Sequence, residues 1–154
     1  MATNYPRTTA QIAGHPIHPM LVPFPIVLFI GALVCDLVFW RTGNRDWATA
    51  SPWLLGFGIA FAGLAAIAGA VEFIGDRRIP RLHGAWWHAL GNVVIVLIET
   101  VNLWLRCERS VAVILPTGLV LSAIACGLLL ITGWIGGRLV YRYRVGVRHQ
   151  DEPL

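Results

Sequence analysis

Four long apolar runs, separated by short polar segments, constrain this chain more than any other feature. They cover about residues 20–40, 52–74, 85–105 and 111–135. Because a helix rises about 1.5 Å per residue, roughly 20 apolar residues cross a hydrocarbon core about 30 Å thick. Lipid offers the backbone no hydrogen-bond partner, and helices satisfy their own backbone groups. The sequence therefore predicts an all-α integral membrane protein, folded as a four-helix bundle.

The composition agrees with one membrane domain. The 154 residues are 56% hydrophobic and only 13% charged, and the mean hydropathy is +0.67. No internal repeat is evident in the residue types, so residues 1–154 are interpreted as a single transmembrane domain. The polar, proline-containing N-terminal segment is not typical of a cleaved signal peptide, and we expect the first span to be retained.

The arginines predict the orientation of the four spans. With an even number of spans, the N-terminus, the loop between the second and third spans, and the basic tail at residues 138–154 share one side of the membrane. That side carries Arg7, Arg77, Arg78, Arg81, Arg138, Arg142, Arg144 and Arg148, and the other side carries Arg41, Arg45, Arg106 and Arg109. The excess predicts that both termini are cytoplasmic. Because the arginines cluster at span ends, topology explains the basic charge and no nucleic-acid partner is expected.

The first span has a proline-interrupted start, residues 14–25 (GHPIHPMLVPFP). A proline lacks an N–H group and disfavours helical angles at the preceding residue. Both His15 and His18 precede prolines, so we expect extended backbone here, with regular helix from about Pro25. Irregular backbone at membrane depth has to be buried in protein or line a cavity. The two histidines are therefore expected to face the interior of the bundle.

Four histidines approach the membrane from the predicted cytoplasmic side, from two different spans. His15 and His18 begin the first span, whereas His83 and His88 begin the third, and Glu72 ends the second span on the same side. Ionisable groups at membrane depth are costly, so such a group is by default a candidate functional site. A site that holds a ligand with imidazole groups is the leading expectation.

A b-type haem is the first candidate ligand. His18 and His88 are the best-placed axial pair, with His15 as a further candidate, and the small residues of the second span leave room for a macrocycle. Arginine pairs well with carboxylates, so four basic residues are candidates for binding the haem propionates: Arg77, Arg78, Arg81 and Arg138. The three cysteines form no motif for a disulfide framework, a zinc ribbon or a c-type haem. This hypothesis describes an electron carrier rather than a stand-alone enzyme.

Two other functions remain open. One is a transition-metal site or ion pathway, for which the candidate ligands are His15, His18, His88 and Glu72. The other is a non-catalytic accessory subunit of a larger membrane complex, in which nothing is bound. The histidines would then cap helix ends, form hydrogen bonds with backbone carbonyls and lie in the membrane interface. The polar residues would then serve packing alone.

A stripe of polar residues follows one face of the third span. His88, Asn92, Glu99 and Asn102 are separated by four, seven and three positions, so a helix presents them on one side. Asp36 in the first span lies at about the level of Glu99. These groups are interpreted either as hydrogen bonds and ion pairs between helices, or as a polar path that joins the two membrane faces.

Two end motifs resemble one known family. They are residues 14–21 with Phe24, Pro25 and Asp36, and residues 133–147 (GWIGGRLVYRYRVGV). Together with His88 and Asn92, they resemble the bacterial membrane proteins grouped as domain of unknown function 2231. The resemblance implies a small four-helix protein of the inner membrane. Some relatives are joined to Rieske-type or cytochrome c-type modules, which favours electron transfer. Separately, we expect a quinone or a redox protein as the partner, and a homo-oligomer or a larger membrane complex as the assembly.

Overall fold

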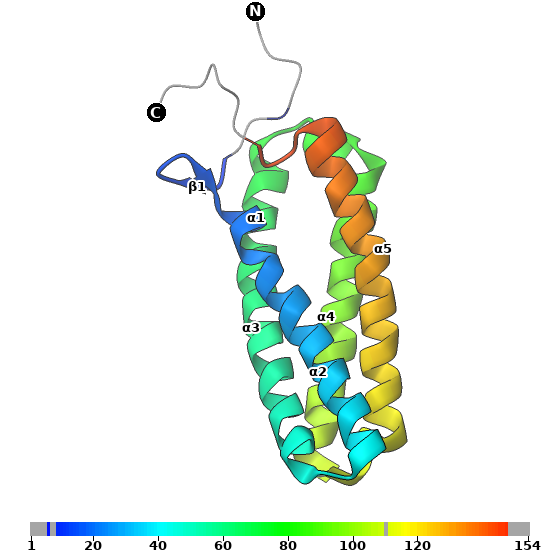
Figure 1. The fold of residues 1–154 in the computed structure, drawn as a ribbon. Helices are drawn as coiled ribbons and strands as arrows, with labels where there is room; N and C mark the ends of the chain where they lie inside the picture. Colours follow the sequence, from blue (N-terminus) through cyan, green and yellow to red (C-terminus); the bar gives the residue numbers. More distant parts are fainter. Residues whose placement is uncertain (1–5, 7–8, 110, 148–154) are drawn as a thin grey trace, which may run out of the picture.

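The computed structural model describes residue 6, residues 9–109 and residues 111–147. It confirms an all-α bundle in which four helices are long and apolar enough to cross a membrane (Figure 1). The candidate spans are Ile17–Thr42, Arg45–Gly75, His83–Arg109 and Ile114–Tyr143. Arg7, Arg148 and His149, which the sequence assigned to the cytoplasmic side, lie outside the described residues.

The elements follow one another as helical hairpins with short connections. The long helices are α2 (Pro23–Thr42), α3 (Arg45–Gly75), α4 (His83–Arg109) and α5 (Leu119–Tyr143). The shorter elements are β1 (Gln11–Ile12), β2 (His15–Pro16), α1 (Ile17–Leu21), η1 (Ile79–Arg81), η2 (Val111–Val113) and η3 (Ile114–Gly118). Each of the helices α2 and α4 packs against both α3 and α5. The core between them contains Phe29, Ala32, Leu55, Ile95, Ala125 and Leu129.

The outer surface of the bundle is apolar. Large side chains such as Val27, Ile67, Leu97 and Leu130 are exposed. Tryptophans near the helix ends are also exposed, among them Trp40, Trp53, Trp86, Trp87, Trp104 and Trp134. An apolar exterior with exposed tryptophans suits a lipid environment. The bilayer is therefore the surrounding medium of this fold.

The bundle has two distinct ends (Figure 1). The first, called here the histidine end, is where α1 begins, α3 ends, α4 begins and α5 ends. The second, called the far end, contains the α2–α3 turn and the η2–η3 connection. The N-terminal hairpin, the loop at residues 76–82 and the end of α5 thus share one end, as the sequence predicts.

The start of the first span corrects the sequence-based expectation of extended backbone up to Pro25. Extended residues end at Pro16, where β1 and β2 form a two-residue hairpin, and His18 lies in the short helix α1. The amide of Val22 donates to the carbonyl of His18 over 3.1 Å, and α2 then starts at Pro23. The prolines are tolerated because they occupy the first turns of α1 and α2, where a helix leaves its N–H groups unpaired.

The helices also extend further than the apolar runs indicate. The turn between the first two spans consists of Gly43 and Asn44, with Gly43 in a left-handed conformation (φ 67°) and the Asn44 side chain accepting from the Asp46 amide over 2.9 Å. The fourth span does not end at Gly136 and Gly137 as expected. Helix α5 continues through them to Tyr143, because Gly136 provides space for a side chain of α4 rather than a helix break.

The two helical hairpins share much of their burial pattern, a correspondence that we call the repeat. The sequence of buried, half-buried and exposed side chains over residues 21–30 recurs without change over residues 91–100. Five buried positions of the second span (51, 55, 58, 65 and 72) likewise recur at 118, 122, 125, 132 and 139. The repeat is not evident in the residue types because side-chain chemistry differs at most of the aligned positions.

Candidate functional site

His18 and His88 meet inside the histidine end of the bundle. Their ring centroids lie 6.3 Å apart, with an angle of 88° between the ring planes. His18 comes from α1 and His88 from the second turn of α4, so the repeat brings equivalent positions of the two hairpins together. Both side chains are half-buried. The structure therefore assembles the pair of imidazoles that the sequence singled out.

Each imidazole is held by a backbone carbonyl of the partner helix in its own hairpin. Nδ1 of His18 lies 2.7 Å from the Ala65 oxygen in α3, and Nδ1 of His88 lies 2.9 Å from the Thr132 oxygen in α5. A carbonyl oxygen only accepts, so each Nδ1 carries the hydrogen and donates it. The neutral ring then has its free lone pair on Nε2. This is the arrangement in which histidines bind metals through one nitrogen while the other donates to the backbone.

A glycine lies beneath each imidazole. A Cβ atom at Gly69 would come within 3.1 Å of Cε1 and Nδ1 of His18, and a Cβ atom at Gly136 would come within 2.8 Å of Cε1 of His88. Each glycine follows the carbonyl-bearing residue by one helical turn. The two hairpins thus hold the imidazole in the same way. The ring packs on a glycine and forms a hydrogen bond with the backbone carbonyl one turn before that glycine.

Asn92 completes the surroundings of His88. Its side-chain Nδ2 donates to the carbonyl of His88 over 2.7 Å and lies 3.4 Å from both ring nitrogens. A position equally distant from both nitrogens lies over the ring face rather than on a lone pair. The amide therefore limits the movement of the ring and leaves Nε2 without a short hydrogen bond.

Two other predicted histidines do not join this pair. His15 is exposed in the β1–β2 hairpin, and its Nδ1 lies 3.0 Å from the Ala13 oxygen. His83 is exposed at the first position of α4. Among the described residues, no three side chains of His, Cys, Asp or Glu converge as a metal-ion site would require. The proposed ligand set of His15, His18, His88 and Glu72 is therefore not assembled.

Glu72 is buried near the histidine end, on the helix that holds His18. It is 4% exposed, and its Oε1 has no hydrogen-bond partner among the described residues. Its carboxylate lies close to Gly146, where a Cβ atom would come within 3.2 Å of Oε2. The turn at the end of α5, with Arg144 and Gly146 at positive φ, thus covers this carboxylate.

The four arginines predicted to bind propionates all lie at the histidine end, but they are not equivalent. Arg77, Arg81 and Arg138 are exposed. Arg78 donates to both oxygens of Asp76, with Nη2 2.6 Å from Oδ2 and Nε 2.9 Å from Oδ1. These hydrogen bonds raise the pKa of the Arg78 guanidinium above its ordinary value. Arg78 is engaged with Asp76, so the other three are the better candidates for an anionic ligand.

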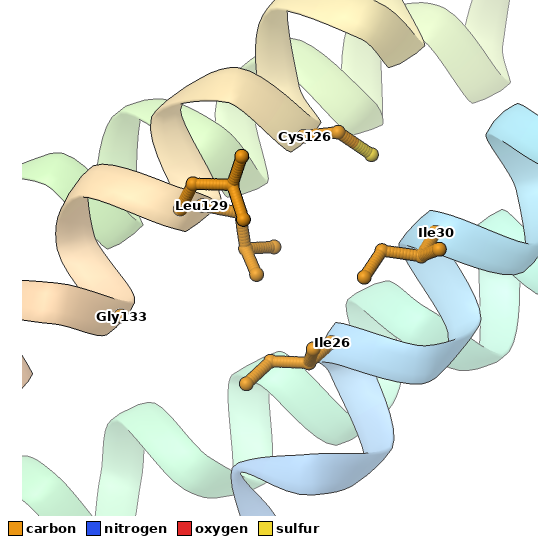
Figure 2. A pocket seen from close by; sticks show the side chains of 6 residues that line it. Ile26, Ile30, Cys126, Leu129 and Gly133 are labelled. Atoms are coloured by element: carbon orange, nitrogen blue, oxygen red, sulfur yellow. The ribbon is translucent and has the colours of Figure 1, made fainter. Parts of the chain in front are cut away.

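An apolar cleft lies between α2 and α5 (Figure 2). Its volume is about 400 Å³, which is within the usual range for ligand pockets. Figure 2 shows Ile26 and Ile30 on one side of it and Leu129 on the other. The full lining is Ile26, Ile30, Cys126, Leu129, Leu130 and Gly133. Gly133 directly follows Thr132, so the cleft begins one residue from the carbonyl that binds His88.

A second polar cluster lies buried towards the far end and is centred on Arg106. Its Nη1 and Nη2 atoms donate to the two carboxylate oxygens of Asp36, each over 2.7 Å. The hydroxyls of Ser51 and Ser122 lie 2.6 and 3.1 Å from the same nitrogens, and each also donates to Asp36. Asp36 and Arg106 are 70 positions apart, the same spacing as His18 and His88. The repeat therefore pairs a carboxylate of one hairpin with a guanidinium of the other.

Glu99 and Asn102 attach to this cluster, which we call the far-end cluster. Asn102 accepts from Nε of Arg106 over 2.9 Å and donates to Oε2 of Glu99 over 2.9 Å. Ile95 and Phe29, both buried, belong to the apolar core that lies between Glu99 and the histidines. The polar stripe of α4 thus forms two separate clusters rather than one continuous path. Asp36 and Asn102 make the interhelical contacts that the sequence suggested, whereas the hydrogen bond of Glu99 is to Asn102 of the same helix.

Sequence reasoning missed the partners of these groups. Ser51, Ser122 and the glycines beneath the histidines were not anticipated, nor was the choice of Arg106 as the partner of Asp36. One signal in the sequence is a spacing of 70 positions, which aligns His18 with His88 and Asp36 with Arg106. It is hidden because the aligned residues at the far end differ in charge.

The comparisons with other proteins agree with this architecture. Residues 14–149 match the family described as "Predicted membrane protein (DUF2231)". No curated protein and no solved structure matches the chain. The matched range includes all four candidate spans, both histidines and the far-end cluster. The chain is therefore a member of the predicted membrane protein family DUF2231.

Proposed function

We propose that this protein is a redox subunit of the membrane, which binds one b-type haem between His18 and His88 and passes electrons to a quinone or a redox protein. The observation that carries the proposal is the distance of 6.3 Å between the two ring centroids. At this spacing, His18 and His88 are the residues that would hold the haem iron.

The hydrogen bonds around the histidines support the same function. Both Nδ1 atoms are engaged with carbonyls, which leaves Nε2 of each ring as the donor to iron. A bound haem supplies one-electron chemistry at a potential set by its axial ligands and its dry surroundings. The residues of this chain fix the tautomer and orient both rings.

The surroundings suit a large amphipathic ligand. The apolar cleft between α2 and α5 would suit the hydrocarbon edge of the macrocycle. Arg77, Arg81 and Arg138 at the histidine end are suited to its propionates. A metal ion alone has less support, because the described residues offer two imidazoles and no third ligand beside them.

We further propose that the histidine end faces the cytoplasm of a bacterial inner membrane. Its described arginines are Arg77, Arg78, Arg81, Arg138, Arg142 and Arg144. At the far end, Arg106 is buried and neutralised by Asp36, which leaves Arg41, Arg45 and Arg109. Positive charge outside the bundle core is thus concentrated at the histidine end.

The test is the haem content of purified variants after expression with sufficient haem. His18→Ala and His88→Ala are expected to lose the haem or to change it from six- to five-coordinate, whereas His15→Ala and His83→Ala retain the wild-type spectrum. Equal haem content and an unchanged spectrum in all four variants would contradict the assignment. A stable protein with neither haem nor metal would favour the accessory-subunit alternative.

A further inference from the structure

The charges of the far-end cluster do not balance if all its acidic groups are ionised. Arg106 supplies one positive charge, and both of its terminal nitrogens bind Asp36. The remaining nitrogen, Nε, donates to the Asn102 side chain. All three guanidinium nitrogens are thus directed at groups other than Glu99, and Asp36 already neutralises the positive charge.

Glu99 is completely buried and only half satisfied. It is 0% exposed; its Oε2 accepts from Asn102, and its Oε1 has no partner among the described residues. An unpaired charge in a membrane interior is far more costly than a neutral carboxylic acid in the same place. The neutral form is therefore the one that this environment stabilises.

The titratable groups around Glu99 come from three helices. They are Asp36 of α2, Arg106 of its own helix α4, and the Cys126 thiol of α5. From α3 the cluster receives the neutral hydroxyl of Ser51. None of these groups brings a second positive charge to Glu99.

The repeat supplies an internal comparison for this position. The counterparts of Glu99 and Asn102 in the first hairpin are Phe29 and Ala32, which are also buried. The fold fills the same places with apolar groups in its other copy, so packing alone does not require a carboxyl here. Glu99 is an added polar group with a free oxygen in an otherwise satisfied cluster.

We infer that Glu99 binds an exchangeable proton, which makes the far-end cluster a proton-binding site within the membrane. The proton reaches Glu99 from the far end, because Asn102 and Arg106 extend from it in that direction while the apolar core separates it from the histidines. The inference does not depend on haem binding and holds whether or not the proposed redox function does.

The test is infrared spectroscopy of the purified protein in H₂O and in D₂O. We expect the carbonyl stretch of a protonated carboxylic acid that shifts to lower frequency in D₂O, and that is absent from the Glu99→Gln variant. Glu72→Gln is the matched control, since Glu72 is also buried and also has an unpartnered oxygen. The Glu99 band must persist in that control.

Further measurements keep the inference falsifiable if the glutamine variant folds poorly. Glu99→Phe copies the residue of the first hairpin and is likewise expected to lack the band. A band that Glu72→Gln removes and both Glu99 variants retain would overturn the inference. So would an ionised Glu99 whose carboxylate bands respond to Na⁺ or K⁺, since the cluster would then bind a metal cation instead of a proton.

Discussion

His18 and His88 begin two different spans, yet their ring centroids lie 6.3 Å apart. Each ring packs on a glycine of the following span, which is α3 for His18 and α5 for His88. Each ring also forms a hydrogen bond with the carbonyl one turn earlier on that helix. The two halves of the site are thus built by the same local rule, once in each helical hairpin. A ligand bound between the rings meets equivalent surroundings from both sides.

The glycines beneath the imidazoles are expected to be essential for the site. In Gly136→Ala the new methyl group would lie 2.8 Å from Cε1 of His88, so the ring has to move away from Thr132. We expect at least a several-fold loss of bound haem per protein, measured by absorbance. Gly127→Ala is the control on the same helix, because its Cβ atom would have no neighbour within 4 Å. Equal haem content in both variants would show that haem binding does not depend on the glycine beneath the His88 ring.

The apolar cleft gives a second prediction about haem binding. Gly133 lines the cleft, and a Cβ atom there would meet nothing within 4 Å. Gly133→Leu should fill the cleft without disturbing helix packing, and we expect haem content to fall while the protein remains folded. Gly127→Leu again serves as the control. If Gly133→Leu binds haem as the wild type does, the macrocycle does not use this cleft.

The ion pair between Asp36 and Arg106 is expected to dominate the stability of the far end. Their side chains are 0% and 1% exposed, and removing one partner of a buried pair costs about 3–5 kcal/mol. Asp36→Asn should therefore lower the melting temperature in detergent substantially.

The repeat suggests a sharper control for that prediction. Because Asp36 and Arg106 occupy equivalent positions, the double variant Asp36→Arg with Arg106→Asp exchanges the two charges between the hairpins. It should recover a large part of the stability lost by either single change. A double variant that is less stable than both single variants would show that the two positions are not equivalent.

The orientation can be tested with a native cysteine. Cys107 is exposed at the far end, whereas Cys35 is buried and Cys126 is half-buried. If the histidine end is cytoplasmic, a membrane-impermeant maleimide should label Cys107 from outside in spheroplasts. Cys107→Ala should abolish this labelling. Labelling that occurs only after the membrane is disrupted would place the far end in the cytoplasm instead.

Much of this fold could be predicted from the sequence because membrane insertion is governed by hydropathy and length. The four spans follow from these properties. So does the placement of the N-terminal hairpin, the loop at residues 76–82 and the end of α5 at one end of the bundle. Together with the position of the prolines, they also predict that His18 and His88 meet. The helical state of His18 could not be predicted, since a proline in a first helical turn looks the same in sequence as a proline in an extended segment.

The partners inside the bundle were less predictable, because helix rotation decides which residues meet. The sequence places Arg41, Arg45 and Arg106 at the same end of the bundle as Asp36, and only packing selects Arg106 as its partner. In the sequence, Gly136 resembles the end of a helix. Its packing against the His88 ring is seen only in the structure. Both features depend on contacts between spans. Such contacts cannot be predicted from the periodicity of residues within one span.

The reduced-minus-oxidised absorption spectrum of the purified wild-type protein tests the central claim most directly. If His18 and His88 hold haem between them, the spectrum has a Soret band and the sharp α-band of a six-coordinate b-type haem, at one haem per chain. A protein that is folded and monodisperse after haem-sufficient expression, but has no Soret band, would contradict the claim.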